Sequence, residues 1–204
     1  RSIPVILSVS IETMGTMLGG QDIAALADAV AHFDLLAIGM NCATGPDFMT
    51  DHLRTLSSLT RAFVICYPNA GLPDENGVYN ESPAMVAKKV GRFADEGWVN
   101  IVGGCCGTTP EHIKLMAEAV AGKPPRRAHK PRRASVSGME SLSLDEDRRP
   151  LIVGERTNVI GSRKFKELIV SGDIESAAEL ARHQVRAGAH IIDVCLANPD
   201  RDEK

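Results

Sequence analysis

The sequence lacks the features that would direct it to a membrane or to nucleic acid. No apolar run approaches the roughly 20 residues that a membrane-spanning helix needs, and no secretory signal peptide is visible. Lysine and arginine number 23 against 26 aspartates and glutamates, so the net charge of -3 gives no general attraction to nucleic acid or anionic lipid. We therefore expect a cytoplasmic protein that has neither nucleic acid nor a membrane as a partner.

An initiator methionine is also missing from the sequence. The opening "RSIPVILSVS" enters a predicted strand almost at once, which indicates a cut into a longer protein. The 204 residues suffice for one large domain or two small ones. With 44% hydrophobic and 24% charged residues, the composition is typical of a soluble globular protein.

Cysteine is present in an odd number, which argues against a framework of disulfides. The five residues are Cys42, Cys66, Cys105, Cys106 and Cys195. Without a secretory signal, this number fits a reducing compartment, where cysteines bind metal or stay free more often than they pair.

Strand-like runs alternate with helical patterns over the first 122 residues. The sequence predicts strands at 5–11, 35–42, 62–71 and 99–106, and helices at 22–33, 46–59, 82–97 and 109–122. Strict alternation of this kind predicts a parallel sheet with helical crossovers. Four such units are half of a (β/α)₈ barrel. They could also be most of a doubly wound sheet, but no strand is followed by a GxGxxG turn that opens a helix.

A change of composition separates this region from the rest. Residues 123–150 have several prolines and little apolar periodicity, which predicts a linker. Its basic cluster could contact nucleic acid, although we favour a solvated linker; the cluster comprises Lys123, Arg126, Arg127, Lys130, Arg132 and Arg133. A strand at 151–158, a helix at 174–188 and a strand at 189–195 then begin a second domain. The predicted fold is thus α/β: the second half of a TIM barrel (1–122), the linker, and the first βαβ unit of a second TIM barrel (151–204).

Three cysteines are predicted to lie at the carboxyl ends of strands, where barrels of this type carry functional groups. Cys42 ends its strand in "GMNCATGP", and Cys105 and Cys106 end theirs in "GGCCGTTP". Neighbouring side chains of a regular strand point to opposite faces, so two adjacent cysteines can serve one metal only if the backbone turns. The flanking glycines allow that turn. Three thiolates suit Zn²⁺ and leave a fourth position open, which is the arrangement of catalytic zinc.

Simpler interpretations of the cysteines stay open. Buried free cysteine is common and often inert, and a vicinal disulfide between Cys105 and Cys106 is possible but strained. Cys66 and Cys195 lie inside strand patterns, so we interpret both as core residues. If zinc is bound, its open position suits a thiol substrate, because the metal lowers the pKa of the thiol. The chemistry implied is alkyl transfer to sulfur.

The two cysteine motifs together resemble a known zinc signature. "GMNCATGP" with "GGCCGTTPEHI" is similar to the signature of the homocysteine S-methyltransferase family. By that resemblance Cys42, Cys105 and Cys106 are the catalytic zinc ligands, and homocysteine is the thiol substrate. "GERTNVIGSRKFKELI" followed by "ARHQVRAGAHIIDVC" resembles the start of the pterin-binding barrel of cobalamin-dependent methionine synthases. The order of homocysteine domain, linker and folate domain also matches that group.

The resemblance implies a complete reaction. A methyl group would pass from methyltetrahydrofolate, by way of methylcobalamin, to zinc-activated homocysteine, giving methionine. The cobalamin-binding domain would be a partner elsewhere in the parent chain. Half of the first barrel would precede Arg1 and most of the second would follow Lys204, so we expect this piece alone to be inactive.

The resemblance also suggests four substrate-binding residues. Asn69, in "YPNAG", would lie near the zinc and could occupy its open position, although "PNAG" justifies a turn residue by itself. In the second domain Glu155, Asn158 and Asp193 would face the pterin from positions at or just past strand ends. Glu155 could instead pair with a neighbouring arginine (Arg156 or Arg163), and Asp193 could be an ordinary carboxylate at the barrel mouth.

Two rival functions remain. The first is zinc-dependent alkyl transfer from another donor, such as a betaine or a sulfonium, against which the pterin-like region argues. The second is a non-catalytic protein with structural zinc. Structural zinc would need a fourth protein ligand; no fourth cysteine has the same placement, and His112 lies on a predicted helix with its own register.

Overall fold

The computed structural model of the chain describes residues 3–128, 134–145, 147 and 149–197. The chain divides into two compact units, Arg1–Ser143 (unit 1) and Leu144–Lys204 (unit 2). Among the described residues, no helix combines the length and the apolar character that crossing a membrane requires.

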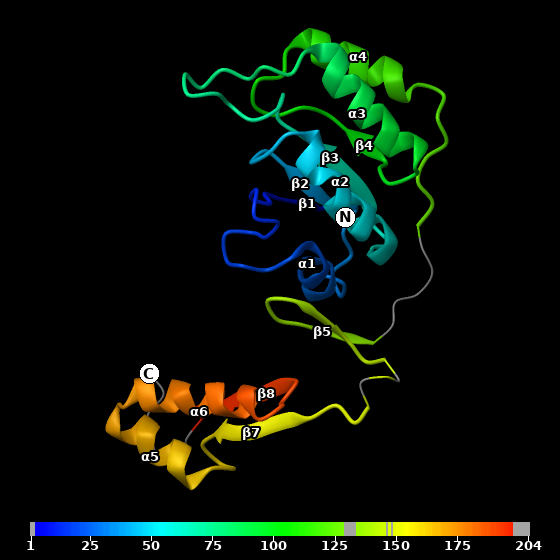
Figure 1. The fold of residues 1–204 in the computed structure, drawn as a ribbon. Coiled ribbons are helices and arrows are strands. Elements are labelled where there is room, and N and C mark those ends of the chain that lie inside the picture. Colours follow the sequence, from blue (N-terminus) through cyan, green and yellow to red (C-terminus); the bar gives the residue numbers. More distant parts are fainter. Residues whose placement is uncertain (1–2, 129–133, 146, 148, 198–204) are drawn as a thin grey trace. The chain divides into compact units, whose positions relative to one another are not determined.

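Unit 1 contains a parallel sheet of four strands in the order β1-β2-β3-β4 (Figure 1). The strands are β1 (Ile6–Val9), β2 (Ala37–Asn41), β3 (Phe63–Tyr67) and β4 (Ile101–Val102). Each is followed by a helix: α1 (Ile23–Ala29), α2 (Pro46–Leu59), α3 (Pro83–Asp95) and α4 (Pro110–Val120). The predicted alternation is therefore confirmed, although β4 is much shorter than the pattern at 99–106 predicts.

Local sequence signals set the starts of these helices. Asp22 and Ser82 precede α1 and α3, and their side chains accept hydrogen bonds from the N–H groups of Ala25 and Met85. The helices α2, α3 and α4 each begin with proline. Proline is tolerated there because the first N–H groups of a helix have no partner within the helix.

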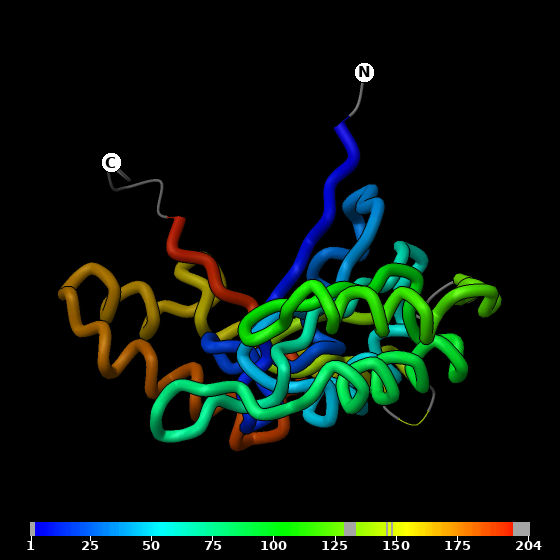
Figure 2. Tube along the Cα trace, turned by 90° about the horizontal axis from the view of Figure 1, so that it is seen from above, coloured from blue at the N-terminus to red at the C-terminus, as the bar shows by residue number. Residues whose placement is uncertain are grey.

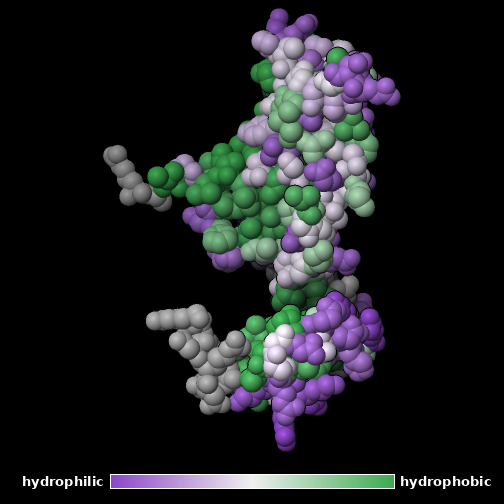
Figure 3. Space-filling model, turned by 90° about the vertical axis from the view of Figure 1, so that its left-hand side faces the viewer, coloured by the Kyte–Doolittle hydropathy of each residue, from purple (hydrophilic) through white to green (hydrophobic). Residues whose placement is uncertain are grey.

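The core of unit 1 lies on one face of the sheet. The strand residues that point toward the helices are fully or almost fully buried: Ile38, Met40, Val64 and Cys66. They pack with Leu53 of α2 and Phe93 of α3. On the other face Ile6 and Phe63 are half exposed, and Figure 3 shows hydrophobic residues gathered over part of unit 1. Helical cover on one face differs from a doubly wound sheet and is consistent with half of a (β/α)₈ barrel.

Part of the predicted linker is folded. Strands β5 (Ser135–Ser137) and β6 (Ser141–Ser143) form an antiparallel hairpin. The hairpin packs on α1, because the Ser137 hydroxyl donates to the Ala25 carbonyl at 2.7 Å and the Asp22 N–H donates to the Met139 carbonyl at 3.0 Å. Residues 135–143 therefore belong to unit 1.

The expectation that the basic cluster is solvated is wrong for Arg126. This side chain is buried, and its guanidinium donates to the carbonyl oxygens of Ser57, Thr60 and Ala62, where α2 ends. These carbonyls have no partner within the helix, so a cation beside them is favourable. Lys123 pairs with Asp95 at 2.7 Å. Arg127 is exposed; Lys130, Arg132 and Arg133 lie outside the described residues.

Unit 2 contains two helices between its strands, where the sequence predicts one. The order is β7 (Val153–Asn158), α5 (Arg163–Ser171), α6 (Ile174–Arg186) and β8 (Ile191–Cys195), and the two helices form the gold and orange part of the tube in Figure 2. The strands pair in parallel with an irregularity between Gly154 and Thr157. The core consists of Val159, Phe165 and Ala177. Cys195, expected in a core, is only partly buried.

Candidate metal centre

Three cysteine sulfurs converge at the carboxyl-end edge of the unit 1 sheet. The Sγ atoms of Cys42, Cys105 and Cys106 all lie within 4.8 Å of one another, with 3.4 Å between Cys42 and Cys106 and 3.9 Å between Cys105 and Cys106. Cys42 follows β2 directly, as predicted. The adjacent pair lies beyond the end of β4, in the loop that leads to α4, rather than at the strand end itself. All five cysteines are free thiols, so Cys105 and Cys106 form no disulfide.

The backbone at Cys42 makes a turn that the sequence does not reveal. Cys42 and Ala43 have φ angles of 57° and 55°, in the left-handed region that residues with a Cβ atom rarely adopt. The N–H of Cys42 donates to the Tyr67 carbonyl at 3.0 Å, and the N–H of Thr44 donates back to the Cys42 carbonyl at 2.6 Å. These hydrogen bonds therefore hold Cys42 in a backbone conformation that is energetically unfavourable for a residue with a Cβ atom.

Glycine shapes the loop that carries the other two thiols. Gly107 has a φ of 77°, and a Cβ atom there would approach Cβ of Tyr79 to 2.3 Å. At Gly103 a Cβ atom would lie 2.7 Å from the ring of Tyr67. The glycines are therefore needed for a left-handed turn in one case and for close approach of an aromatic ring in the other.

Asn69 links this loop to the loop that follows β3. Its side-chain oxygen accepts the N–H of Cys106 at 3.1 Å, and the side chain is buried. Two backbone bonds reinforce the link, from Cys105 N–H to the Pro68 carbonyl and from Ala70 N–H to the Cys106 carbonyl, each 2.9 Å long. Asn69 is thus more than a turn residue, while its contact with a bound metal stays a prediction.

The thiols of the cluster differ in acidity. Hydrogen bonds from the Cys106 thiol and from the Ala43 backbone lower the pKa of Cys42, because both stabilise its thiolate. Burial, together with the neighbouring thiols, raises the pKa of Cys105 to about 11. Three thiolates at these separations would repel one another, so a cation between them would favour full ionisation.

The donor set fits Zn²⁺. Tetrahedral zinc with Zn–S bonds of about 2.3 Å places its sulfurs roughly 3.8 Å apart, and the separations of 3.4 Å (Cys42–Cys106) and 3.9 Å (Cys105–Cys106) lie on either side of that value. Within the described part of the chain, no histidine, carboxylate or further cysteine joins the group. The nitrogens of His112 already bind Thr109 and the Glu81 carbonyl. A fourth coordination position would therefore be free for another ligand.

Tyr79 is a neighbour of the cluster that the sequence analysis missed. It lies in the loop between β3 and α3 and is partly buried. Burial and a hydrogen bond with the Cys106 thiol raise the pKa of its hydroxyl. Its position against Gly107 depends on the folding of a loop without periodic pattern, so no signal in "GVYN" could have placed it here.

In unit 2 the structure brings together two of the three predicted pterin residues. The Asn158 amide donates to Asp193 Oδ2 at 2.7 Å, and its oxygen accepts the N–H of Ile160 at 2.9 Å. Asn158 ends β7 as predicted, but Glu155 and Asp193 lie inside β7 and β8. Both of these carboxylates are exposed.

Of the two alternative partners of Glu155, Arg163 pairs with another carboxylate. Arg163 pairs with Glu167 one turn along α5, at 2.8 Å. The side chain of Glu155 is exposed on a strand whose pairing is irregular at this point. Contacts of Glu155, Asn158 and Asp193 with a pterin stay predictions.

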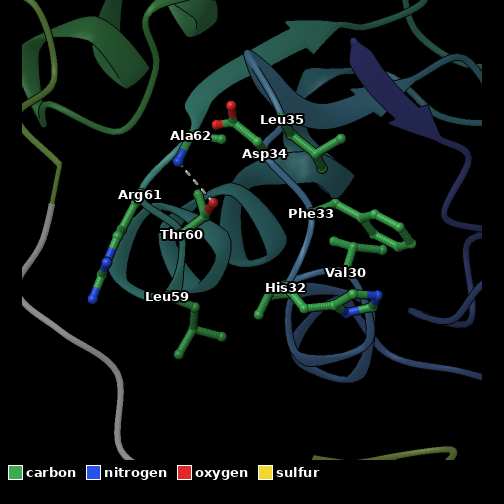
Figure 4. Close-up of a pocket in the computed structure, with 11 residues that line it drawn as sticks. Val30, His32, Phe33, Asp34, Leu35, Leu59, Thr60, Arg61 and Ala62 are labelled. Carbon is green, nitrogen blue, oxygen red and sulfur yellow. Dashed lines mark hydrogen bonds between the residues drawn. The ribbon is translucent and has the colours of Figure 1, made fainter.

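A hollow of about 490 Å³ lies at the opposite edge of the unit 1 sheet (Figure 4). Its walls come from the loops that precede β2 and β3, including His32, Asp34 and Arg61. In the same loop the Ala62 N–H donates to the Thr60 hydroxyl at 3.1 Å. Because these loops are at the amino ends of parallel strands, a ligand in this hollow would not reach the thiols.

Comparison with known families agrees with this division of the chain. The profile of the homocysteine S-methyltransferase family matches residues 1–120, which include the three clustered cysteines. The profile of pterin binding enzymes matches residues 154–203, which include Asn158 and Asp193. Since the first match covers more than half of the sequence, the chain belongs to the homocysteine S-methyltransferase family, and a pterin-binding region follows its methyltransferase region.

Proposed function

We propose that Cys42, Cys105 and Cys106 hold a zinc ion whose fourth position accepts the thiol of homocysteine. The observation that carries this proposal is the convergence of three sulfurs from two loops within 4.8 Å. Bound zinc would supply a positive charge that lowers the pKa of the substrate thiol. Cys106 is exposed, which leaves the cluster open to a substrate from solvent.

The residues of the chain would prepare this site. Asn69 holds the Cys105–Cys106 loop through the Cys106 N–H, and the left-handed turn directs Cys42 to the same point. The substrate thiol would lose its proton, and its sulfur would form a bond to the methyl carbon. The bond between that carbon and its donor breaks at the same time, and the donor keeps the electron pair.

The pterin-binding region supports methyltetrahydrofolate as the first methyl donor, rather than a betaine or a sulfonium. Asn158 and Asp193 would hold the pterin and help to protonate its leaving nitrogen. We propose that a cobalamin on a separate domain carries the methyl group between the two sites. The activity would be that of a cobalamin-dependent methionine synthase. A purely structural zinc is disfavoured because no fourth ligand joins the cluster among the described residues.

Zinc and proton stoichiometry test this function. In a protein that contains this chain and completes its first barrel, we expect one zinc per barrel, and we expect added homocysteine at neutral pH to release close to one proton per zinc, because the thiol binds as thiolate. Homoserine, which has a hydroxyl in place of the thiol, should release none. Cys106→Ala should lose tight zinc binding, whereas Cys195→Ala in unit 2 should retain it. Full zinc content in Cys105→Ala would contradict the assignment.

A further inference from the structure

Glu81 occupies a junction behind the thiol cluster. It ends the loop between β3 and α3, its side chain is 19% exposed, and its Cγ packs 2.8 Å from where a Cβ atom of Gly71 would lie. Two successive backbone hydrogen bonds connect Glu81 to Cys106 by way of Ala70. The Glu81 N–H donates to the Ala70 carbonyl at 3.1 Å, and the Ala70 N–H donates to the Cys106 carbonyl at 2.9 Å.

Lys89 of α3 ties this junction to the start of α2. Its ammonium group lies 2.8 Å from Glu81 Oε1 and 2.7 Å from Asp47 Oδ2. Asp47 is in the first turn of the helix that follows the Cys42 loop. Burial by itself would lower the pKa of Lys89, but the two carboxylates outweigh it and raise the pKa. The ammonium therefore stays charged and joins the loop that carries Glu81 to the first turn of α2.

His112 of α4 ties the same junction to the loop of Cys105 and Cys106. It occupies the third position of α4, where a capping box normally has Glu or Gln. Its Nδ1 accepts the Thr109 N–H at 3.1 Å, as such a residue should. The second ring nitrogen, Nε2, donates to the Glu81 carbonyl at 3.0 Å. A buried histidine thus serves as helix cap and as brace between two loops.

We propose that Lys89 and His112, acting through Glu81, are positioning residues that hold the Cys42 loop and the Cys105–Cys106 loop at the separation a shared metal needs. This inference rests on the proposed zinc site. The segment between Pro68 and Ser82 joins the two cysteine loops, because the Asn69 N–H donates to the Thr44 carbonyl at 3.2 Å and the Ala70 N–H donates to the Cys106 carbonyl at 2.9 Å. Residues outside the ligand set that orient the ligands commonly change metal affinity by about 10–100-fold when they are replaced.

Two substitutions of His112 separate the brace from the cap. Asn in position 112 places Oδ1 close to where the ring has Nδ1, so it can still accept the Thr109 N–H, but it has no atom in place of Nε2 and should not reach Glu81. Ala removes both contacts. We therefore expect His112→Asn and His112→Ala to lose zinc affinity to a similar extent, about 10-fold or more, whereas only His112→Ala should lose much thermal stability in the metal-free chain.

Lys89 provides an independent test on another helix. Lys89→Met removes both ion pairs, and Lys88→Met is the matched control because Lys88 is the exposed neighbour on the same helix. We expect the first to weaken zinc binding and the second to leave it unchanged. Lys89→Met leaves the largely buried Glu81 carboxylate without its cation. In the double variant Lys89→Met/Glu81→Gln this partner is neutral, and we expect the same loss of zinc affinity.

Zinc affinity, measured by chelator competition on a protein that contains this chain and completes its first barrel, and the visible spectrum after loading with Co²⁺ are the readouts. A merely structural role would shift the melting temperature and leave the affinity and the Co²⁺ spectrum as they are in wild type. Wild-type affinity in both His112→Asn and Lys89→Met would overturn the positioning role while leaving the zinc site intact. Failure of the wild-type chain to bind zinc would overturn the proposed function, and this inference with it.

Discussion

The side-chain oxygen of Asn69 accepts the backbone N–H of Cys106 at 3.1 Å, across 37 residues of sequence. A short amide side chain from one strand-end loop thereby fixes the backbone of the next. Asn69 is buried and the bond is partly shielded from water, so an unpaired Cys106 N–H would carry a desolvation cost if the acceptor were removed.

Replacing this amide should therefore loosen the thiol loop. We expect Asn69→Ala to weaken zinc binding about 10–100-fold, the range typical of residues that support metal ligands. Asn76→Ala is the matched control, because Asn76 lies on the same loop and is exposed. Equal zinc affinity of the two variants in a chelator competition would refute the supporting role.

The metal-free thiols should react in a defined order. The pKa of Cys42 is lowered and that of Cys105 is raised to about 11. Only thiolates are alkylated efficiently, and a lower pKa populates the thiolate at lower pH. The iodoacetamide rate at Cys42 should therefore rise with pH below the ordinary thiol value of about 8.5, and that at Cys105 well above it. Peptide mapping of the zinc-free chain measures both rates; the opposite order would contradict the hydrogen-bond pattern.

The left-handed turn predicts an unusual effect of glycine. Ala43→Gly should stabilise unit 1 by about 0.5–1 kcal/mol, because glycine avoids the steric cost of a positive φ but loses more chain entropy. Ala43→Val should destabilise it. The matched control is Ala117→Gly in the exposed face of α4, which should cost about 1 kcal/mol. Urea unfolding followed by Trp98 fluorescence reports unit 1, since Trp98 packs beside Phe93. A destabilised Ala43→Gly chain would show that the turn is not strained.

Arg126 should contribute to stability although it lies in the predicted linker. Its guanidinium serves three carbonyls at the end of α2. Because hydrogen bonds to charged groups are stronger than neutral ones, we expect Arg126→Ala to lower the free energy of unfolding by about 2–3 kcal/mol. Arg127→Ala, at the exposed neighbour, should change it by less than about 0.5 kcal/mol. Similar values for the two would mean that residue 126 is as solvated as the sequence predicts.

The two half-reactions should separate in a full-length enzyme that contains this chain. Cys106→Ala should abolish methyl transfer from methylcobalamin to homocysteine and keep demethylation of methyltetrahydrofolate. Asp193→Ala should show the reverse, because demethylation of methyltetrahydrofolate needs polar groups at the pterin. Each half-reaction is assayed with free cobalamin. Parallel loss of both activities in either variant would contradict two independent sites.

The thiol cluster could be predicted from the sequence, because its position depends only on the order of the parallel strands. Parallel strands end at one edge of a sheet, so the cysteines that follow β2 and β4, on either side of β3, reach the same edge. Helix α2 agrees with its predicted bounds at both ends, because Pro46 marks its first turn. Strand β4 is shorter than predicted, since the chain leaves the sheet at the glycines that follow Val102.

The residues around the cluster could not be predicted in the same way. Tyr79 and Glu81 lie near the cluster because of the path of the loop between β3 and α3. That loop has no periodic pattern from which its path could be predicted. The sequence places His112 on a helix, but its contact with Glu81 depends on tertiary structure and cannot be predicted from the helical pattern. The missed helix α5 did carry signals, a capping Ser162 and a closing Gly172. The hairpin of β5 and β6 carries weak ones, because serine alternates with single apolar residues.

Cys66 lies on the helix side of β3 with no exposed surface, its sulfur 3.8 Å from that of Met49. Burial raises the pKa of this thiol to about 12, so a thiol reagent meets a reactive group there only when the core opens. Labelling of such a group proceeds at its intrinsic rate multiplied by the population of the open state. Of the five cysteines, Cys66 alone is buried, so its thiol should react last. The rate of this last reaction therefore reports how often the core opens, and its dependence on urea measures how much of the core must open at once.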